Sequence, residues 1–283
     1  MYNICCTIVS TSHIYKGITL LKSLQAYDNY STLLYLIVME PVDFKLDNIN
    51  ILNIDHFLKS DEDAIKMADK YKDDELRWSI KSVVIRYLVN NYQEANVLYC
   101  DCDMFFFDYP THLFNYLEEG GIVLTPHWRP LNPETDLVQF RANFINGLFN
   151  AGCIAANTAG IPALNWWVQA CISGCERNFM QGLWFDQAYL DLMPIYFSQT
   201  VICRHFGYNV AYWNSHLRNE YLDGTKTLKD FFSIILAHFT KDTILSIESG
   251  ADTLLEPYLD KYKKSIKNSL KLLVEVRNNQ KLQ

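Results

Sequence analysis

The chain has 283 residues, of which 49% are apolar and 20% are charged, so it can bury a substantial core without disulfides or a structural metal. Lys and Arg total 25 and Asp and Glu total 32, which gives a net charge of −7. A dedicated nucleic-acid-binding protein carries a basic surface, so we expect no nucleic-acid partner.

Strand-like and helix-like segments alternate along the first part of the chain. Apolar runs at residues 4–9, 33–39 and 49–54 predict strands. Helical spacing over residues 18–26 predicts a helix between the first two of these strands.

A more charged stretch leads into a further helix and strand. Ser60 and Asp63 fit a capping box at the start of a helix. Residues 80–88 carry apolar side chains at i, i+3, i+4, i+7 and i+8, which predicts one buried helix face, and residues 97–100 predict a strand. The alternation of helices and strands predicts an α/β fold with a mainly parallel sheet.

The second half is less regular and ends in a basic segment. Pro162 begins a predicted helix, and we expect Trp166 and Trp167 on that helix to lie in the core. Residues 258–283 contain seven Lys or Arg and two acidic residues, with apolar residues at helical spacing. We therefore predict a single domain over residues 1–257, followed by a basic amphipathic helical tail.

The sequence favours a cytoplasmic location. No positive charge precedes Lys16, no signal-peptide cleavage site follows, and no apolar run approaches the ~18 residues of a membrane span. The eight cysteines have no metal-site or disulfide spacing, so we expect reduced, mostly buried thiols. The basic tail could bind anionic lipid at the inner face of a membrane, or it could pack on the domain.

The main chemical signal is the sequence VLYCDCD at residues 97–103. In an extended segment alternate side chains share a face, so Asp101 and Asp103 should point together and Cys100 and Cys102 away from them. Paired carboxylates at the carboxyl end of a strand suit Mg²⁺ or Mn²⁺, and open sheets bind ligands at that end. A solvated turn is the alternative, and the orientation of the cysteines disfavours a zinc site.

Glycine-rich phosphate loops are absent. The chain has 11 glycines and contains neither G-x-G-x-x-G nor the P-loop pattern. The phosphates of a bound nucleotide would therefore need a metal ion or Lys and Arg side chains to neutralise them, and a paired-aspartate site supplies the metal.

Seven segments in a fixed order resemble the family 8-like bacterial glycosyltransferases, which have the GT-A fold, use nucleotide-sugar donors and act in polysaccharide and lipopolysaccharide synthesis. The matching segments extend from residue 4 to about residue 241 and are the opening strand with STS at 10–12, RWSIK at 77–81, VLYCDCD at 97–103, FNAG at 149–152, FDQAYLD at 185–191, GYNVAYWN at 207–214 and AHFTK at 237–241. Thr240 departs from the family pattern, which usually has glycine there.

The resemblance implies a metal site. Asp101 and Asp103 would bind Mn²⁺ or Mg²⁺, and His238, placed at a strand end by the apolar run 231–237, would complete the ligand set. A hydrogen-bonded core histidine is the alternative for His238.

The resemblance also implies donor-binding residues. Thr7, Ser10 and Tyr15, just past the first strand, would bind the uracil and ribose, and Tyr15 could stack on the base. The other implied donor-binding residues are Arg77, Lys81, Asp101, Cys102, Asp103 and Lys241. Lys81 could reach the diphosphate, or it could be a solvated surface lysine.

Further roles are implied around the reacting carbon and the acceptor. Asp186 and Gln187 are the implied catalytic residues, and a helix N-cap is the alternative for Asp186. The implied acceptor-binding residues are His127, Trp128, Asn150 and Gly152. Gly152 would let the backbone approach a ligand closely.

The expected function is metal-dependent transfer of a sugar, with retention, from a nucleotide-diphosphate sugar, favoured as a UDP-sugar, to a hydroxyl of a saccharide or lipid-linked glycan. Residues 1–110 would bind the donor and residues 111–257 the acceptor. A nucleotidyltransferase would need a glycine- and lysine-rich loop that residues 10–17 lack. A phosphatase with an aspartate nucleophile would need Thr or Val where Phe105 stands. A non-catalytic carbohydrate-binding protein would leave the paired aspartates without a role.

Overall fold

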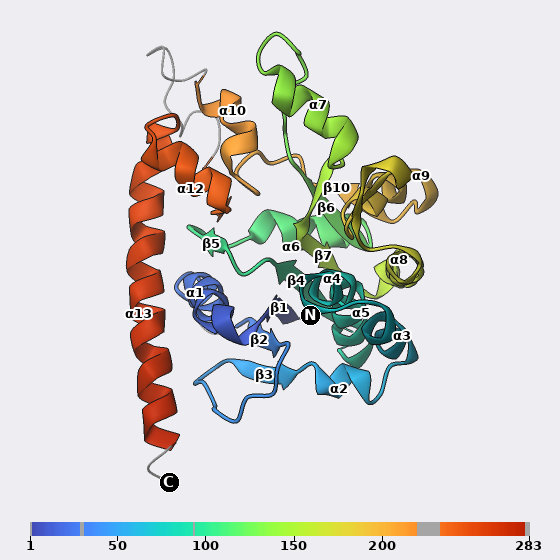
Figure 1. Cartoon of the computed structure of the whole chain (residues 1–283), viewed down its shortest axis with the longest axis vertical. Helices are drawn as coiled ribbons and strands as arrows, with labels where there is room; N and C mark the ends of the chain where they lie inside the picture. Colours follow the sequence, from blue (N-terminus) through green and yellow to red (C-terminus); the bar gives the residue numbers. More distant parts are fainter. Residues whose placement is uncertain (1, 29–30, 93, 220–232, 281–283) are drawn as a thin grey trace.

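A mixed sheet forms the centre of the computed structural model, which describes residues 2–28, 31–92, 94–219 and 233–280 (Figure 1). Seven strands among these residues pair in the order β10-β6-β7-β4-β1-β2-β3. Their bounds are β1 (Tyr2–Val9), β2 (Leu33–Val38), β3 (Asn50–Asn53), β4 (Ala95–Cys100), β6 (Ile122–Pro126), β7 (Phe149–Ala156) and β10 (Thr200–Ile202).

Only β7 runs against its neighbours in this sheet. The strands β3, β2, β1 and β4 are parallel, and β10 is parallel to β6, whereas β7 pairs antiparallel with both β4 and β6. The amino end of β7 therefore lies beside the carboxyl end of β4. The predicted mainly parallel α/β sheet is confirmed.

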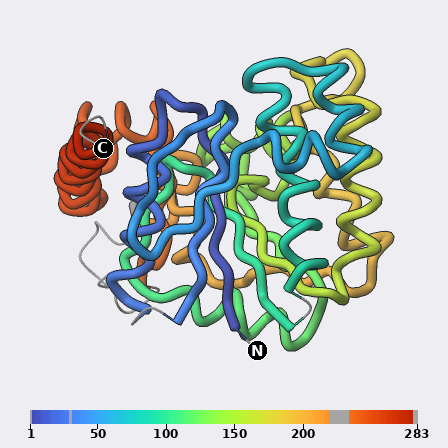
Figure 2. The backbone as a smooth tube through the Cα atoms, turned by 90° about the horizontal axis from the view of Figure 1, so that it is seen from below, coloured from blue at the N-terminus to red at the C-terminus, as the bar shows by residue number. Residues whose placement is uncertain are grey.

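Helices cover both faces of the sheet (Figure 2). Their bounds are α1 (Ile14–Gln25), α2 (Asp55–Leu58), α3 (Glu62–Lys70), α4 (Asp73–Ser79), α5 (Lys81–Asn91), α6 (Thr111–Glu119), α7 (Leu137–Ile145), α8 (Ile161–Ser173), α9 (Met193–Tyr196), α10 (His216–Asn219), α12 (Lys241–Glu248) and α13 (Glu256–Gln280). On one face α5 and α8 cover the sheet, and on the other α1 lies between the sheet and α13.

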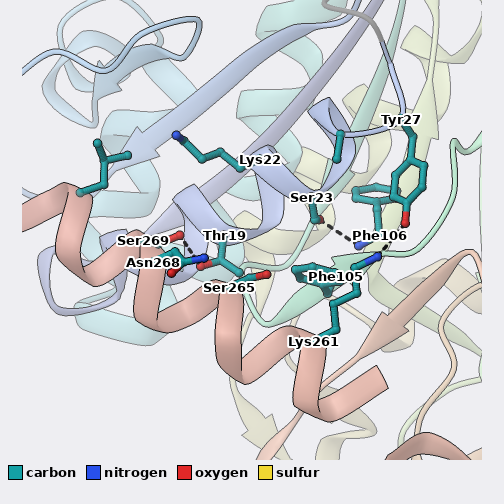
Figure 3. Close-up of a pocket in the computed structure, with 12 residues that line it drawn as sticks. Thr19, Lys22, Ser23, Tyr27, Phe105, Phe106, Lys261, Ser265, Asn268 and Ser269 are labelled. Atoms are coloured by element: carbon teal, nitrogen blue, oxygen red, sulfur yellow. Dashed lines mark hydrogen bonds between the residues drawn. The ribbon is translucent and has the colours of Figure 1, made fainter. Parts of the chain in front are cut away.

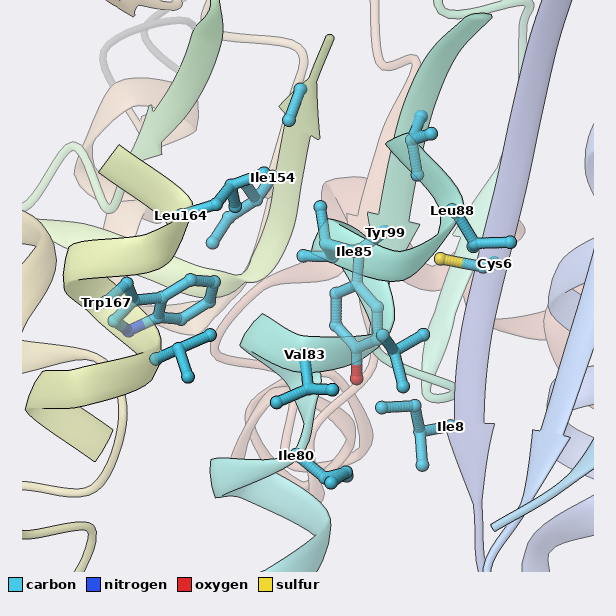
Figure 4. Packing of buried hydrophobic residues seen from close by; sticks show 14 of the residues in the cluster. Cys6, Ile8, Ile80, Val83, Ile85, Leu88, Tyr99, Ile154, Leu164 and Trp167 are labelled. Carbon is cyan, nitrogen blue, oxygen red and sulfur yellow. The ribbon is translucent and has the colours of Figure 1, made fainter. Parts of the chain in front are cut away.

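The alternation of side chains along β1 divides the core into two layers. Cys6 and Ile8 point to the layer under α5 and α8, where Trp167 is fully buried (Figure 4). Cys5 and Val9 point to the opposite layer, under α1. A strand buried on both faces reads as a continuous apolar run, which is why β1 could be predicted from the sequence.

The start of α3 differs from the predicted capping box. Asp61 is the N-cap, and its carboxylate accepts hydrogen bonds from the amides of Asp63 and Ala64 at 3.0 and 3.1 Å. The Ser60 hydroxyl instead donates to the carbonyl of His56. The capping position was therefore wrong by one residue, because either side chain is a suitable cap and the sequence does not fix which one meets the free amides.

The basic tail is a helix that packs on the domain. Leu259, Tyr262 and Leu273 of α13 are buried, and Thr19 of α1 donates a buried hydrogen bond to Ser269 at 2.8 Å. The helix begins two residues before the predicted boundary at 257/258. The structure therefore shows the tail packed on the domain, which was one of the two expectations for it. No helix in the described part of the chain has the length and apolar character needed to cross a membrane.

A cavity of about 260 Å³ lies between α1 and α13 (Figure 3). Phe105 and Phe106 line it from the sheet side, and Lys261 of α13 donates a 2.9 Å hydrogen bond to the Tyr27 hydroxyl at its edge. Ser23 ties α1 to this region by accepting a hydrogen bond from the Phe106 amide. This cavity is lined by none of the residues predicted for the site.

Candidate active site

Asp101 and Asp103 lie in a tight turn immediately after β4. The Met104 amide donates to the Asp101 carbonyl at 3.0 Å, so the segment is a turn and not the extended strand that was expected. The two carboxylates nevertheless converge with the His238 imidazole, and one candidate ligand atom from each residue lies within 4.8 Å of the others. The predicted pairing of the carboxylates is confirmed, although the local conformation that produces it was wrong.

A small second sheet brings His238 to this turn. The strand β5 (Met104–Phe106) pairs antiparallel with β11 (Leu236–His238), and Met104 is the direct partner of His238. His238 is the last residue of its strand, as expected; the first two residues of the apolar run 231–237 lie outside the described residues.

His238 and Asp103 form a buried pair. His238 Nε2 lies 3.0 Å from Asp103 Oδ1, and the His238 side chain is only 7% exposed. Burial disfavours the imidazolium, but the Asp103 carboxylate outweighs it and raises the pKa of His238. Burial likewise opposes ionisation of Asp103, yet His238 lowers its pKa to about 2. The histidine is therefore hydrogen-bonded within the protein, and it lies where it could bind a metal ion together with the two carboxylates.

The ligand atoms that this cluster offers suit a small divalent cation. Two carboxylates and one imidazole are ligands that Mn²⁺ accepts, and carboxylate oxygens are what Mg²⁺ prefers. Asp101 and Asp103 are both partly exposed, so a cation has access to their oxygen atoms.

Lys81 is a buried cation beneath the cluster. It is 2% exposed, and its Nζ lies 2.8 Å from Asp186 Oδ2 and 3.6 Å from Asp101 Oδ1. It also donates to the Ala151 carbonyl at 3.0 Å. Burial lowers the pKa of Lys81, but the two carboxylates outweigh it and raise the pKa overall. The alternative of a solvated surface lysine is wrong.

Asp186 and Gln187 are both held in place by other groups. Asp186 is 3% exposed and caps no helix, since Gln187 is the N-cap of the following 3₁₀ helix η4 (Ala188–Leu192). Burial raises the pKa of Asp186, and Lys81 opposes this rise. Gln187 accepts from the Ala151 amide at 3.2 Å and donates to the Asn146 carbonyl at 2.6 Å. The carboxamide therefore joins η4 to the start of β7.

Gly152 brings β7 against the acidic cluster. A Cβ at this position would lie 2.6 Å from both Asn150 Oδ1 and Asp101 Oδ2. The Asp101 amide donates to the Gly152 carbonyl at 2.8 Å, and the Gly152 amide donates to Asn150 Oδ1 at 2.6 Å. Close packing of backbone and carboxylate is therefore the reason for glycine here.

His127 is neutral and buried beside the start of β7. It is 2% exposed, its Nδ1 lies 3.2 Å from the Leu148 carbonyl, and its Nε2 lies 3.3 Å from Asn150 Nδ2. Burial, and then Arg129, lower its pKa well below the usual value. Nδ1 therefore donates to the carbonyl and Nε2 accepts from Asn150. Trp128 is half-buried with φ +54°, and the centroid of its ring lies 4.5 Å from that of the Phe206 ring.

The three donor-binding residues predicted near β1 lie in three different elements. Thr7 lies inside β1 and is fully buried, so it is a residue of the strand and not past it as expected. Ser10 follows the strand, and its Oγ lies 2.8 Å from His13 Nδ1. Tyr15 is a half-buried residue of α1, packed against the core under that helix.

The remaining predicted donor-binding residues are Arg77, Cys102 and Lys241. Arg77 pairs with Asp74 at 2.7 Å. Cys102 is buried, and its pKa rises to about 12 through burial and the neighbouring carboxylates. Lys241 is exposed at the first position of α12, where the Thr240 hydroxyl caps the helix by accepting from the Thr243 amide at 3.1 Å. Capping accounts for Thr240 at this position.

Two residues that the sequence analysis did not single out make hydrogen bonds to the Asp101 and His238 side chains. The Tyr99 hydroxyl donates to Asp101 Oδ1 at 2.8 Å. Asn209, fully buried with φ +56°, has its Oδ1 3.4 Å from His238 Nδ1. Tyr99 lies on β4, two residues before Asp101, and Asn209 lies within the segment 207–214. Both residues therefore belong to segments that the sequence analysis quoted, and this was the signal by which they could have been found.

A comparison with protein-family models finds no match for this chain. The chain is similar to the uncharacterized protein YfnF of Bacillus subtilis (strain 168), with 26% identity over an alignment of 258 residues that covers 86% of this chain and 82% of YfnF.

Two solved glycosyltransferase structures are similar in fold. A crystal structure of the galactosyltransferase LgtC with donor and acceptor sugar analogs matches with a TM-score of 0.58 and 11% identity, over 94% of this chain and 95% of that one. Mouse xyloside xylosyltransferase 1 matches with a TM-score of 0.53 and 13% identity, over 86% and 98% of the two chains. The chain therefore has the GT-A glycosyltransferase fold, as the sequence resemblance predicted.

Proposed function

We propose that the chain is a metal-dependent glycosyltransferase that moves a sugar from a UDP-sugar to a hydroxyl of a saccharide or a lipid-linked glycan. The observation that carries this proposal is the convergence of Asp101, Asp103 and His238 at the carboxyl end of β4 in a GT-A fold. Open α/β sheets bind ligands at that edge. The likeness to LgtC and to mouse xyloside xylosyltransferase 1 supports the reaction class.

The three residues of the cluster would hold Mn²⁺ or Mg²⁺. When bound, the ion supplies positive charge to the diphosphate leaving group. Lys81 supplies no direct contact in this proposal, since its ammonium is buried against Asp186 and Asp101. Its ammonium instead holds the Asp186 and Asp101 carboxylates in place from beneath the cluster.

We propose transfer with retention of the anomeric configuration. An inverting enzyme needs a positioned base on the face opposite the leaving group. Asp186 is the candidate for such a base among the predicted site residues. Its ion pair with Lys81 and its 3% exposure leave it poorly placed to accept a proton from the acceptor hydroxyl. Gln187, fixed at both ends of its carboxamide, would line the reacting centre without taking a proton.

The direct test is UDP binding by isothermal titration calorimetry with and without Mn²⁺. We expect binding that requires the ion and is lost in the double variant Asp101→Asn/Asp103→Asn. Asp108→Asn is the matched control, because Asp108 is an exposed carboxylate on the same stretch. Equal UDP affinity in the wild type and the double variant would contradict the proposed site.

A panel of UDP- and GDP-sugars then identifies the donor through metal-dependent release of the nucleotide. NMR of the product formed with the active donor gives its anomeric configuration, and an inverted product would overturn retention. Nucleotide binding also separates this proposal from a carbohydrate-binding protein. Transfer of the sugar rather than the nucleotidyl group separates it from a nucleotidyltransferase.

A further inference from the structure

The segment of residues 207–210 lies beside β11 and holds the backbone of His238. The Val210 amide donates to the Leu236 carbonyl at 3.1 Å, and the His238 amide donates to the Val210 carbonyl at 2.8 Å. The preceding residue, Asn209, contacts the His238 ring, with its Oδ1 3.4 Å from Nδ1. The position of the imidazole therefore depends on the position of this segment.

Asn209 adopts a backbone conformation that needs support from its surroundings. Its φ of +56° lies in the left-handed region, which is uncommon for residues other than glycine, although asparagine tolerates it better than most. Its Nδ2 donates to the Pro126 carbonyl at 3.3 Å, and its carbonyl accepts from Asn214 Nδ2 at 3.0 Å. The first bond directs the carboxamide so that Oδ1 faces His238, and the second anchors the backbone that carries it.

Asn214 uses both ends of its own carboxamide in buried hydrogen bonds. It is the last residue of the 3₁₀ helix η5 (Tyr212–Asn214) and is 1% exposed. Besides the bond to Asn209, its Nδ2 donates to the His127 carbonyl at 3.0 Å, and its Oδ1 accepts from the Ala211 amide at 3.0 Å. Such a group holds its neighbours in place, because loss of any one bond leaves a buried polar atom without a partner.

Arg218 and Asp252 fix the orientation of Asn214. Arg218 of α10 is fully buried, and its Nη1 donates to Asn214 Oδ1 at 2.9 Å. Its Nη2 donates to the Ala211 carbonyl at 2.7 Å, and its Nε donates to Asp252 Oδ2 at 3.1 Å. Asp252 is 2% exposed and lies between α12 and α13. Because a guanidinium is planar and its donors have fixed directions, these contacts define one geometry. A hydrogen-bonded path therefore runs from the start of α13 to His238.

We propose that Asn214, oriented by the ion pair of Arg218 and Asp252, is a positioning residue for the metal site. It holds the backbone of Asn209, and Asn209 in turn orients the ring of His238. The proposal rests on the proposed function, because it concerns the metal site of that enzyme. Groups that orient a histidine ligand affect metal affinity without contacting the ion.

Asn214→Asp is the main test. Aspartate keeps the shape and the oxygen that accepts from Ala211 and Arg218, but it removes the NH₂ group that binds the carbonyls of Asn209 and His127. We expect Mn²⁺ binding by the full chain, measured by calorimetry, to weaken about 10-fold or more.

A nuclear magnetic resonance measurement on the metal-free protein gives a second readout. The ¹⁵N chemical shift of His238 Nδ1 should move in Asn214→Asp, and loss of the signal in His238→Gln assigns it. An unchanged Mn²⁺ affinity or an unmoved His238 signal in a folded Asn214→Asp chain would overturn the proposal.

Asn157→Asp is the matched control, because Asn157 makes the same kinds of bonds as Asn214. Its Nδ2 donates to the carbonyls of Leu117 and Gly120 at 2.9 and 3.1 Å. Its Oδ1 accepts from the Ala159 amide at 2.9 Å. Asn157 follows the carboxyl end of β7, whereas the acidic cluster lies beside the amino end. The control should lower Tm and leave both readouts unchanged. An equal loss of Mn²⁺ affinity would show a general effect of lower stability and contradict the proposal.

Asp252→Asn tests the far end of the path. It keeps the shape of the side chain and removes the charge that faces Arg218. We expect it to weaken Mn²⁺ binding by a smaller factor than Asn214→Asp and to move the His238 signal in the same direction. Wild-type behaviour in both readouts would overturn the role of the ion pair. If Asn214→Asp does not fold, the same result in Asp252→Asn overturns the whole proposal.

UDP titrations separate this inference from the proposed function. If the wild type binds UDP with Mn²⁺ and Asn214→Asp binds both as tightly, only the Asn214 inference is lost. If the wild type binds no Mn²⁺, the proposed function is lost, and the His238 signal of the metal-free variants still decides whether Asn214 positions the ring.

Discussion

At the scale of single residues, the acidic site depends on a glycine that carries no chemistry of its own. Gly152 is close to Asp101 through a backbone hydrogen bond, and it leaves no room for a side chain. Its neighbours at that point are a carboxylate oxygen and the Asn150 carboxamide, which is itself bonded to His127. A change at Gly152 must therefore displace one of the groups that define the site.

We predict that Gly152→Ala lowers the free energy of unfolding by about 1–3 kcal/mol and weakens Mn²⁺ binding, since the new methyl group pushes Asp101 out of position. Chemical denaturation and calorimetry measure the two effects. Gly182→Asn is the control, because Gly182 has φ +70° with nothing near its Cβ position, and asparagine tolerates this conformation. Unchanged Mn²⁺ affinity in Gly152→Ala would show that Asp101 adjusts freely.

Asn209 contacts the proposed metal site through His238. Its Oδ1 accepts from His238 Nδ1, which leaves Nε2 as the ring nitrogen that faces Asp103. We predict that Asn209→Gly, which tolerates φ +56° but removes the acceptor, weakens Mn²⁺ binding about 10- to 100-fold. Asn209→Asp keeps the acceptor and should retain most of the affinity. Equal Mn²⁺ affinity in all three proteins would remove Asn209 from the site.

At the scale of elements, a polar cluster joins three helices on one face of the sheet. Arg86 of α5 contacts Asp61 and Asp63 at the start of α3 at 2.9 Å each, and Gln169 of α8 donates to Asp63. Burial would raise the pKa of Asp63, but the hydrogen bonds from Arg86, Gln169 and Lys66 lower it overall. The ionised form of Asp63 therefore stabilises this helical layer.

We predict that Arg86→Met lowers the free energy of unfolding at pH 7 by about 1–2 kcal/mol. The pKa of Asp63 in the folded state is below its ordinary value of 3.8. The ionised carboxylate therefore stabilises the fold above pH 3.8, and this stabilisation is lost as the pH falls through the lowered pKa. The difference between wild type and variant should therefore shrink in acid, as urea unfolding at a series of pH values will measure. Lys59→Met, which breaks an exposed pair with Asp55, should change little.

Elements with a local signal could be predicted from the sequence, and contacts between distant segments could not. The buried strands β1, β2 and β4 follow from their apolar runs, and α8 follows from its proline and apolar face. In contrast, His238 lies 135 residues from Asp103, and only the family resemblance placed the two together, because the pairing of β11 with β5 that joins them has no local pattern in the sequence. The burial of Lys81 was missed for the same reason, since its two carboxylate partners come from other elements.

At the scale of the whole molecule, charge is segregated onto α13. The chain has a net charge of −7, yet Lys264, Lys267 and Lys271 are all exposed on this helix, while its opposite side packs against α1. We propose that this basic surface holds the enzyme beside an anionic membrane, where a lipid-linked acceptor would be found.

We predict that the intact protein co-sediments with vesicles containing phosphatidylserine at low salt, and less so as salt is raised, because counter-ions screen the attraction. Reversal of Lys264, Lys267 and Lys271 to Glu should abolish this. Lys59→Glu/Lys72→Glu, at exposed lysines next to α2 and α4, should have a smaller effect. Binding that survives the triple reversal would mean that another surface meets the lipid.

The single antiparallel strand of the central sheet has one more consequence. Because β7 runs antiparallel to β6, residues 127–148 leave the sheet and re-enter it at the same edge, while Asp101 and Asp103 lie apart from this segment, in the turn after β4. A relative could exchange that excursion for one of another length and shape without disturbing the cluster of Asp101, Asp103 and His238. We expect chimaeras that swap this segment to alter which molecule receives the sugar while leaving donor use unchanged.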